Sequence, residues 1–203
     1  MKFLSIPYRE GWTSPLIHKS SIEAKRLPET KQDAYECMDL LLCFRTQCIR
    51  LLIIYKPPSS PPSRFFDELS LAMEAVCSTR DKLVVIGVFN IHVELAENAV
   101  ALTFLGLMEA FGLTQCVAVP THIKDRTLDM VFTRDVENCV SQTCVTSLIS
   151  DHYAVQCCLV VHTPRWPIGR TLFRSLRSIE LFVADLIGLD LFNDPATMVL
   201  TCR

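Results

Sequence analysis

Three short polar strings in the sequence carry side chains that can do chemistry. They are Gly87–His92, Thr127–Asp129 and Ser150–His152, and they supply an amide, two carboxylates and two imidazoles. An imidazole exchanges a proton near neutral pH, and a carboxylate can orient that imidazole or bind a hard cation such as Mg²⁺. Taken singly, each string is also typical of a polar strand cap, a turn or a surface carboxylate.

The elements that must position these strings follow from the apolar pattern. Short apolar runs predict strands, whereas apolar residues three and four positions apart predict amphipathic helices. We expect strands over 37–44, 49–55, 83–87, 128–133, 139–148 and 153–161, and helices through 65–76 and 101–111, with Gly112 as a left-handed C-cap. This alternation indicates a layered α/β fold, with the polar strings at the carboxyl ends of strands, where open α/β sheets hold their sites.

The distribution of prolines and charges divides the chain into three parts. Residues 1–34 contain three prolines and no clear periodicity, so we expect an irregular lead-in there. Residues 35–162 hold the predicted strands and helices. Residues 163–203 begin with a basic stretch, Arg165–Arg177, and continue into a predicted amphipathic helix. The sequence therefore predicts one main domain with a segment on each side.

The composition limits the classes of protein to which the chain can belong. Half of the 203 residues are hydrophobic and 21% are charged, which excludes disorder as a description of the whole chain. The formal net charge of -2 gives no overall positive field, so contact with a polyanion such as DNA must be local. No apolar stretch reaches the roughly 20 residues that cross a bilayer. We expect no membrane partner and an intracellular location, nuclear or cytoplasmic.

The ten cysteines fall largely within apolar runs, and none forms a C-x-x-C pair. Structural zinc sites usually draw on such pairs, so we do not expect one. Disulfide frameworks are typical of smaller secreted chains, so we expect the thiols to be reduced. His92 and His122 have the spacing of neither a zinc motif nor a general base and are interpreted as loop residues.

Seven motifs follow one another between Glu36 and Val161. They are Ile53–Pro58, Phe66–Leu69, Val85–Val93, Phe111–Gln115, Pro120–His122, Thr127–Asp129 and Ser150–His152. In this order they resemble the endonuclease/exonuclease/phosphatase superfamily, and most of all the endonuclease domain of LINE-type, non-LTR retrotransposons. The resemblance implies a DNase I-like α/β fold, a layered sandwich of two β-sheets flanked by helices. Because it starts only at Glu36, we expect this fold to be incomplete at its N-terminus.

The resemblance also implies an activity, the Mg²⁺-dependent hydrolysis of DNA phosphodiesters, with DNA bound through its phosphate backbone. His152 would contact the scissile phosphate and act as acid or base, and Asp129 would fix its tautomer. Asp151 would help to hold Mg²⁺. Asn90 would donate to a phosphate oxygen and position the water, and Tyr55 would offer its hydroxyl to the same phosphate. No small-molecule cofactor is implied.

Structural explanations stay open for several of these positions. Tyr55 could simply cap its strand, and Asp129 with His152 could form a buried structural pair. The stretch Arg165–Arg177 is interpreted as a solvated linker face, with a phosphate-binding strip as the alternative.

One position departs from the family's Gly-Asp-Phe-Asn motif. The Asp of that motif aligns or deprotonates the attacking water, and this sequence has Val88 in its place. Valine cannot accept a proton, and loss of a positioned acid or base lowers a rate about 10²- to 10⁴-fold. The family's metal-binding Glu has no counterpart in residues 1–34, so Mg²⁺ should bind weakly. We predict an endonuclease-like domain with impaired or no activity. The alternatives are a domain that binds nucleic acid without cutting and an inert remnant of a retrotransposon protein.

Overall fold

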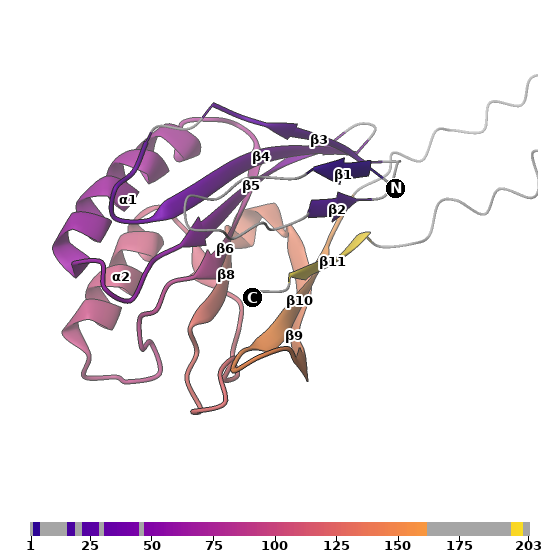
Figure 1. Ribbon diagram of the computed structural model, residues 1–203. Coiled ribbons are helices and arrows are strands. Elements are labelled where there is room, and N and C mark those ends of the chain that lie inside the picture. Colours follow the sequence, from indigo (N-terminus) through magenta and orange to yellow (C-terminus); the bar gives the residue numbers. More distant parts are fainter. Residues whose placement is uncertain are drawn as a thin grey trace, which may run out of the picture.

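The computed structural model describes residues 2–4, 16–18, 22–28, 31–44, 47–161 and 196–200 (Figure 1). Its strands are β1 (Lys2–Leu4), β2 (Leu16–His18), β3 (Glu23–Arg26), β4 (Glu36–Phe44), β5 (Gln47–Tyr55), β6 (Lys82–Val88), β7 (Thr114–Gln115), β8 (Asp129–Thr133), β9 (Val140–Leu148), β10 (Tyr153–Leu159) and β11 (Ala196–Leu200). Its helices are α1 (Pro62–Cys77) and α2 (Ala99–Ala110), with a 3-10 turn η1 (Asp135–Glu137). The predicted basic stretch and amphipathic helix after residue 163 lie outside the described residues.

The main sheet has six strands in the order β3-β4-β5-β6-β8-β7. Its central pair, β5 and β6, runs parallel, and the other neighbours are antiparallel. A parallel pair needs a crossover connection, which α1 provides between β5 and β6. A second, antiparallel sheet has the order β11-β10-β9. In Figure 1 this smaller sheet lies on the opposite side of the main sheet from the two helices.

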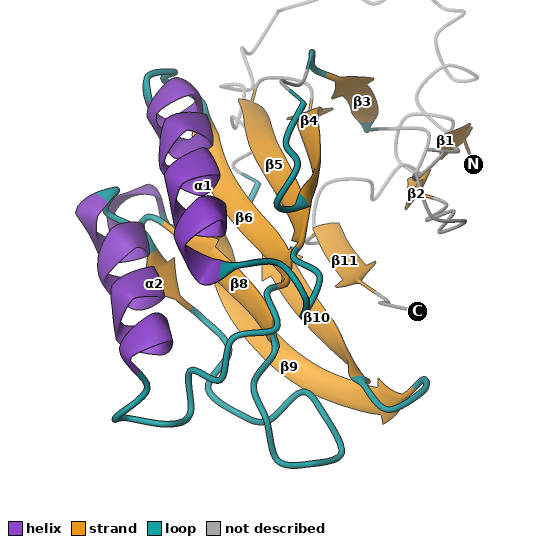
Figure 2. Ribbon diagram, turned by 60° about the vertical axis from the view of Figure 1, so that its left-hand side comes forward, coloured by secondary structure: helices purple, strands orange, loops and turns teal. Residues whose placement is uncertain are grey.

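Helices α1 and α2 lie side by side over one face of the main sheet (Figure 2). The fixed φ of proline suits the first helical turn, and α1 accordingly begins with Pro62 directly after Pro61. Its buried side chains recur every three or four residues, at Phe65, Leu69, Met73 and Val76. Helix α2 begins at Asn98, whose side chain accepts two main-chain N–H groups of the first turn. Its end is followed by Gly112 with a φ of 70°, in agreement with the predicted C-cap.

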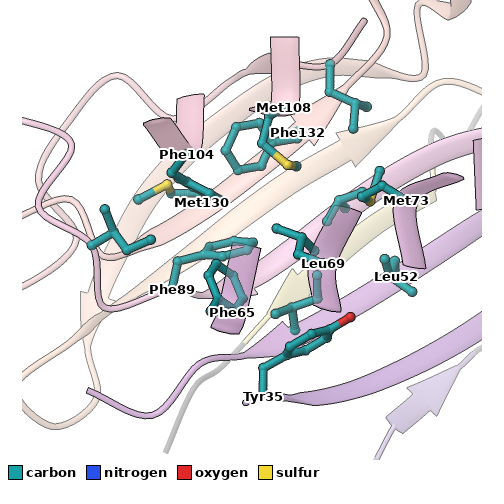
Figure 3. Packing of buried hydrophobic residues seen from close by; sticks show 14 of the residues in the cluster. Tyr35, Leu52, Phe65, Leu69, Met73, Phe89, Phe104, Met108, Met130 and Phe132 are labelled. Carbon is teal, nitrogen blue, oxygen red and sulfur yellow. The ribbon is translucent and has the colours of Figure 1, made fainter. Parts of the chain in front are cut away.

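The core between the helices and the main sheet is built around phenylalanine rings (Figure 3). Phe65 comes from α1, Phe104 from α2, Phe132 from β8 and Phe89 from the residue after β6. The ring centroids of Phe89 and Phe104 are 4.9 Å apart, and Phe132 meets both rings edge-on. This packing anchors Phe89, and with it the neighbouring residues Val88 and Asn90 of the motif Val85–Val93.

A second core fills the space between the two sheets. Alternate residues of the central strands point into it, as the period of two in a strand requires, and the smaller sheet contributes Val155, Cys157 and Leu159. The strands of the main sheet therefore bury both faces, which explains why β6 reads as a continuous apolar run. Two β-sheets with helices on the outer face confirm the predicted DNase I-like layered sandwich.

The structure differs from the sequence expectations in two local respects. Within the segment 1–34, which was expected to be irregular, β1 pairs with β2, and β3 forms an edge of the main sheet. Cys43 and Cys48 are joined by a disulfide, so the expectation of reduced cysteines is wrong for this pair. The reason is the register of β4 with β5, which sets these two residues directly opposite each other with their Cα atoms 4.1 Å apart.

Candidate active site

The candidate site lies at one end of the main sheet, where three neighbouring strands present Tyr55, Val88 and Asp129. In the strand register Tyr55 is opposite Val88, and Val88 is opposite Asp129. Side chains in register share a face of the sheet, and these three share the face that packs against the smaller sheet. The string Ser150–His152 follows the carboxyl end of β9, as expected, whereas Asp129 is the first residue of β8, so the expectation that it follows a strand is wrong. Because β8 is antiparallel to β6, its start meets the end of β6.

A sharp turn after β6 fixes Asn90. Gly87 has a φ of 154°, and a Cβ atom at this position would overlap the carbonyl oxygen of Ile54, so glycine is required where β6 passes β5. Asn90 itself has a φ of 50°, in the left-handed region that asparagine tolerates. Its side-chain Nδ2 donates to the carbonyl oxygen of Lys56 at 2.7 Å, which ties the turn to the end of β5.

Lys56 is buried beneath this turn. Its Nζ donates to the carbonyl oxygen of Pro57 at 3.2 Å and lies 5.8 Å from the ring centre of Phe65. Burial lowers the pKa of the Lys56 ammonium, because the charged form loses its hydration. The main-chain N–H of Lys56 donates to the carbonyl oxygen of Val88, so Lys56 joins the ends of β5 and β6.

Asp129 and His152 are in close polar contact. Nδ1 of His152 lies 2.7 Å from Oδ2 of Asp129, and the two side chains are 18% and 6% exposed. This contact places the imidazole proton on Nδ1 and leaves Nε2 of His152 available for a substrate, a proton or a metal ion. The other carboxylate oxygen, Oδ1 of Asp129, is buried and has no hydrogen-bond partner among the described residues.

Thr121 holds the two strand starts together, and the sequence reasoning assigned it no role. Its hydroxyl oxygen accepts the main-chain N–H groups of both Leu128 and Asp129 at 3.0 Å. Its carbonyl oxygen accepts the N–H of Tyr153 at 2.7 Å, next to His152. Thr121 is fully buried, so these contacts form in the absence of competing water. The only signal in the sequence was its place in the motif Pro120–His122.

His122 also belongs to the site, although the sequence analysis interpreted it as a loop residue. It forms an antiparallel bridge with His152, and the two rings meet edge-on with their centroids 4.8 Å apart. Its Nε2 lies 3.4 Å from Oδ2 of Asp151, and its Nδ1 accepts the N–H of Lys124 at 3.1 Å. His122 also forms a bridge with Arg126, which is near it in sequence. Nothing in the sequence indicated its contact with His152.

Asp151 is the exposed carboxylate of the site, with 61% of its side chain accessible. The hydroxyl of Ser150 donates to its Oδ1 at 3.0 Å. This hydrogen bond is the largest cause that lowers the pKa of Asp151, and the contact with His122 acts in the same direction. Asp151 is therefore a carboxylate at neutral pH, with lone pairs free on both oxygens.

His92, the other histidine interpreted as a loop residue, stands in a separate set of contacts. Its Nε2 lies 3.2 Å from a guanidinium nitrogen of Arg126, and its Nδ1 lies 3.2 Å from Oε1 of Glu94. Glu94 in turn accepts the N–H of Thr127 at 3.3 Å. These contacts join the loop after Asn90 to the loop before β8.

The donor atoms of the site fit a hydrated Mg²⁺ ion. Mg²⁺ prefers oxygen ligands, keeps several waters and is usually bound by one or two carboxylates together with substrate phosphates. Asp151 offers an ionised, accessible carboxylate, whereas Oδ1 of Asp129 is buried and Asp129 is not part of the cluster formed by His122, Asp151 and His152. Val88, which is buried between Tyr55 and Asp129 in the register, offers no donor atom.

Comparisons with solved structures identify the fold. The endonuclease domain of TRAS1, a telomere-specific non-LTR retrotransposon, matches with a TM-score of 0.61 and 15% identity over 75% of each chain. A mannosyl-6-phosphatase of Bacteroides thetaiotaomicron matches with a TM-score of 0.57 and 11% identity over 79% of this chain and 77% of that one. TDP2 of D. rerio, complexed with a single-strand DNA product, matches with a TM-score of 0.50 and 11% identity over 76% of both chains.

The fold is that of the endonuclease/exonuclease/phosphatase superfamily, and the resemblance inferred from the seven motifs is confirmed at this level. The similarity to the TRAS1 domain extends the resemblance to the endonucleases of non-LTR retrotransposons. The structural neighbours are nucleases and phosphatases. No family model matches the sequence, and no curated protein is detectably similar to it. In the part of the chain that the structure describes, neither helix is long and apolar enough to cross a membrane.

Proposed function

We propose that the chain carries a DNA phosphodiesterase site of the endonuclease type in which Val88 has strongly reduced the hydrolytic rate. The observation that carries the proposal is the 2.7 Å contact between Asp129 and His152, which leaves Nε2 of His152 free beside the carboxylate of Asp151. A carboxylate that orients an imidazole next to an accessible anionic ligand is an arrangement suited to acid–base chemistry on a phosphate ester.

In the proposed reaction a water oxygen attacks phosphorus and the bond to the leaving oxygen breaks. Nε2 of the charged His152 ring gives its proton to the leaving oxygen, and the proton of the attacking water passes to solvent because position 88 holds no base. Asp129 holds the tautomer of His152 and stabilises the charged ring. Asn90 and Tyr55 donate hydrogen bonds to phosphate oxygens. Asp151 would hold Mg²⁺, which when bound would offset negative charge on the phosphate.

The proposal includes a low rate, because no group at position 88 can orient or deprotonate the water. The side chain of Val88 is 8% exposed and apolar. A missing general base lowers a rate about 10²- to 10⁴-fold, which would still leave slow hydrolysis detectable with enzyme in excess. The domain limits 35–162 and an intracellular location stay predictions from the sequence.

Nicking of supercoiled plasmid by excess protein tests this proposal. We expect slow conversion to the open circular form in Mg²⁺, no conversion in EDTA, and loss of the activity in His152→Ala. A matched control is His92→Ala, which removes an imidazole outside the Asp129–His152 pair. Nicking that persists in His152→Ala or in EDTA would show that the site is not responsible.

The second candidate function is binding of DNA phosphates without cleavage. Val88 favours this function, because it stands where the family motif has the Asp that activates the water. The basic residues that would supply charge, Arg165, Arg170 and Arg174, lie outside the described residues. Fluorescence anisotropy with duplex DNA at two salt concentrations distinguishes this function, because phosphate binding weakens steeply with salt. Salt-dependent DNA binding together with no nicking in the plasmid assay would favour binding without cleavage.

A further inference from the structure

We propose that His122, Asp151 and His152 form a binding site for a divalent transition-metal ion of the Zn²⁺ class, chemically distinct from a Mg²⁺ site. Each of the three side chains offers one ligand atom, and these atoms lie within 4.8 Å of one another. Two imidazoles and a carboxylate are a donor set that suits Zn²⁺, Ni²⁺ or Cu²⁺, whereas Mg²⁺ prefers oxygen alone.

The distance between His122 and Asp151 supports this assignment. Nε2 of His122 and Oδ2 of Asp151 are 3.4 Å apart, longer than the usual range for a strong hydrogen bond. A tetrahedral Zn²⁺ ion with bonds of 2.0 to 2.2 Å separates its ligand atoms by about 3.3 Å. The two atoms are therefore spaced as neighbours in one coordination sphere.

His152 is prepared as a ligand by Asp129. A histidine that binds metal commonly donates its other ring N–H to a carboxylate, which fixes the ring orientation and makes the metal-binding nitrogen more basic. The 2.7 Å contact between Nδ1 of His152 and Oδ2 of Asp129 supplies this support, with 94% of the Asp129 side chain buried. Nε2 of His152 remains for the ion.

His122 is held in place before any ion binds. Its side chain is 10% exposed, and its backbone bridges both Arg126 and His152, so little side-chain entropy is lost on coordination. The N–H of Lys124, which approaches Nδ1 of His122 at 3.1 Å, must turn away when Nε2 binds metal. A hydrogen bond of this kind contributes only about 0.5 to 1.5 kcal/mol net, and Lys124 lies in an exposed turn that can move. A coordinate bond to Zn²⁺ outweighs this loss.

The proposed metal site goes beyond the proposed hydrolytic function, and an ion bound there would inhibit hydrolysis. It would occupy Nε2 of His152 and the carboxylate of Asp151, the same groups that hydrolysis needs. The site therefore predicts that micromolar Zn²⁺ blocks any Mg²⁺-dependent activity. The binding test contains no DNA, so its outcome is independent of whether the chain cuts phosphodiesters.

Titration of the full chain with Co²⁺, a spectroscopic substitute for Zn²⁺, tests the proposal directly. We expect one equivalent to bind with a visible d–d spectrum and without the thiolate charge-transfer band that cysteine ligands would give. Zn²⁺ should displace the Co²⁺, whereas excess Mg²⁺ should not. A charge-transfer band, displacement by Mg²⁺ or absence of binding would overturn the proposal.

Two variants and one matched control assign the ligands. His122→Phe keeps an aromatic ring against His152, and Asp151→Asn changes an exposed side chain that contributes little to folding. Each should weaken Co²⁺ binding at least roughly 100-fold, since loss of even a supporting outer contact costs 10- to 100-fold. His92→Phe, which removes an imidazole outside the cluster, should leave the affinity unchanged. Equal affinity in the parent and His122→Phe would contradict the assignment.

Discussion

The hydroxyl of Thr121 and the main-chain N–H of Asp129 are joined by a 3.0 Å hydrogen bond inside the core, and this contact sets the position from which Asp129 reaches His152. The same hydroxyl accepts the N–H of Leu128. One buried oxygen thus satisfies the first two donors of the chain entering β8.

Replacement of Thr121 by Val should therefore destabilise the protein. Val keeps the shape of Thr but leaves two buried N–H groups without an acceptor, and each such group costs about 1 to 3 kcal/mol. Thr121→Ser, which keeps the hydroxyl, should retain most of the free energy of unfolding. Urea denaturation of the three proteins measures this difference. Equal losses in Val and Ser would mean that the methyl group, and not the hydroxyl, matters at this position.

Glu68 should make stability depend on pH. Burial opposes its ionisation, but the N–H groups of Ala34 and Asp33 and the guanidinium of Arg64 outweigh this, so the pKa of Glu68 is lowered. A lowered folded-state pKa stabilises the fold above the unfolded pKa, about 4.3, and the contribution is lost as pH falls through the folded value. Glu68→Gln should lower the melting temperature at pH 7 but not at about pH 3.

Asp67→Asn is the matched control, because Asp67 is an exposed carboxylate on the same helix. Its effect should stay within about 0.5 kcal/mol, as for most surface substitutions. A pH-independent difference between Glu68→Gln and the parent would contradict the proposed role of Glu68, which is to hold the chain before β4 against α1.

The thiol of Cys157 should be unreactive in the folded protein. It is 1% exposed, and burial raises its pKa to about 12, so very little of the reactive thiolate exists at pH 8. Iodoacetamide labelling followed by mass spectrometry should modify the half-buried Cys144 well before Cys157. Cys43 and Cys48 should label only after a reductant opens their disulfide. Equal labelling of Cys144 and Cys157 would show that the Cys157 face of β10 is not packed against the main sheet as described.

The layered fold could be predicted from the sequence because the central elements bury wide apolar faces. The run Leu83–Gly87 is apolar on both faces, as in a buried central strand. The apolar residues three and four positions apart through Phe65 and Leu69 fit only a helix. The antiparallel pairing of β8 with β6 was not predicted, because an apolar run does not indicate which strand it pairs with or in which direction. The Cys43–Cys48 disulfide was missed because the apolar pattern alone does not fix the register of the β4–β5 hairpin, which sets these two residues, five apart in sequence, opposite each other.

The structure brings together Asp129, Asp151 and His152, which the sequence analysis selected, and adds contacts of two residues to which it gave no role in the site. Asp129, Asp151 and His152 stand in short strings with chemically distinctive neighbours. Thr121 and His122 act through hydrogen bonds and ring contacts across loops, to Asp129 in one case and to Asp151 and His152 in the other. Neither contact leaves a periodic pattern in the sequence.

The most direct test of the central claim, that Val88 silences a site which is otherwise assembled, is single-turnover plasmid nicking by Val88→Asp in Mg²⁺. We predict a gain of about 10²- to 10⁴-fold over the parent chain, because the new carboxylate can orient the water beside Asp129. Asn has nearly the same shape as Asp but cannot accept the proton, so Val88→Asn should gain far less activity. His152→Ala added to Val88→Asp should abolish the gain. A folded Val88→Asp protein that nicks no faster than the parent would contradict the account.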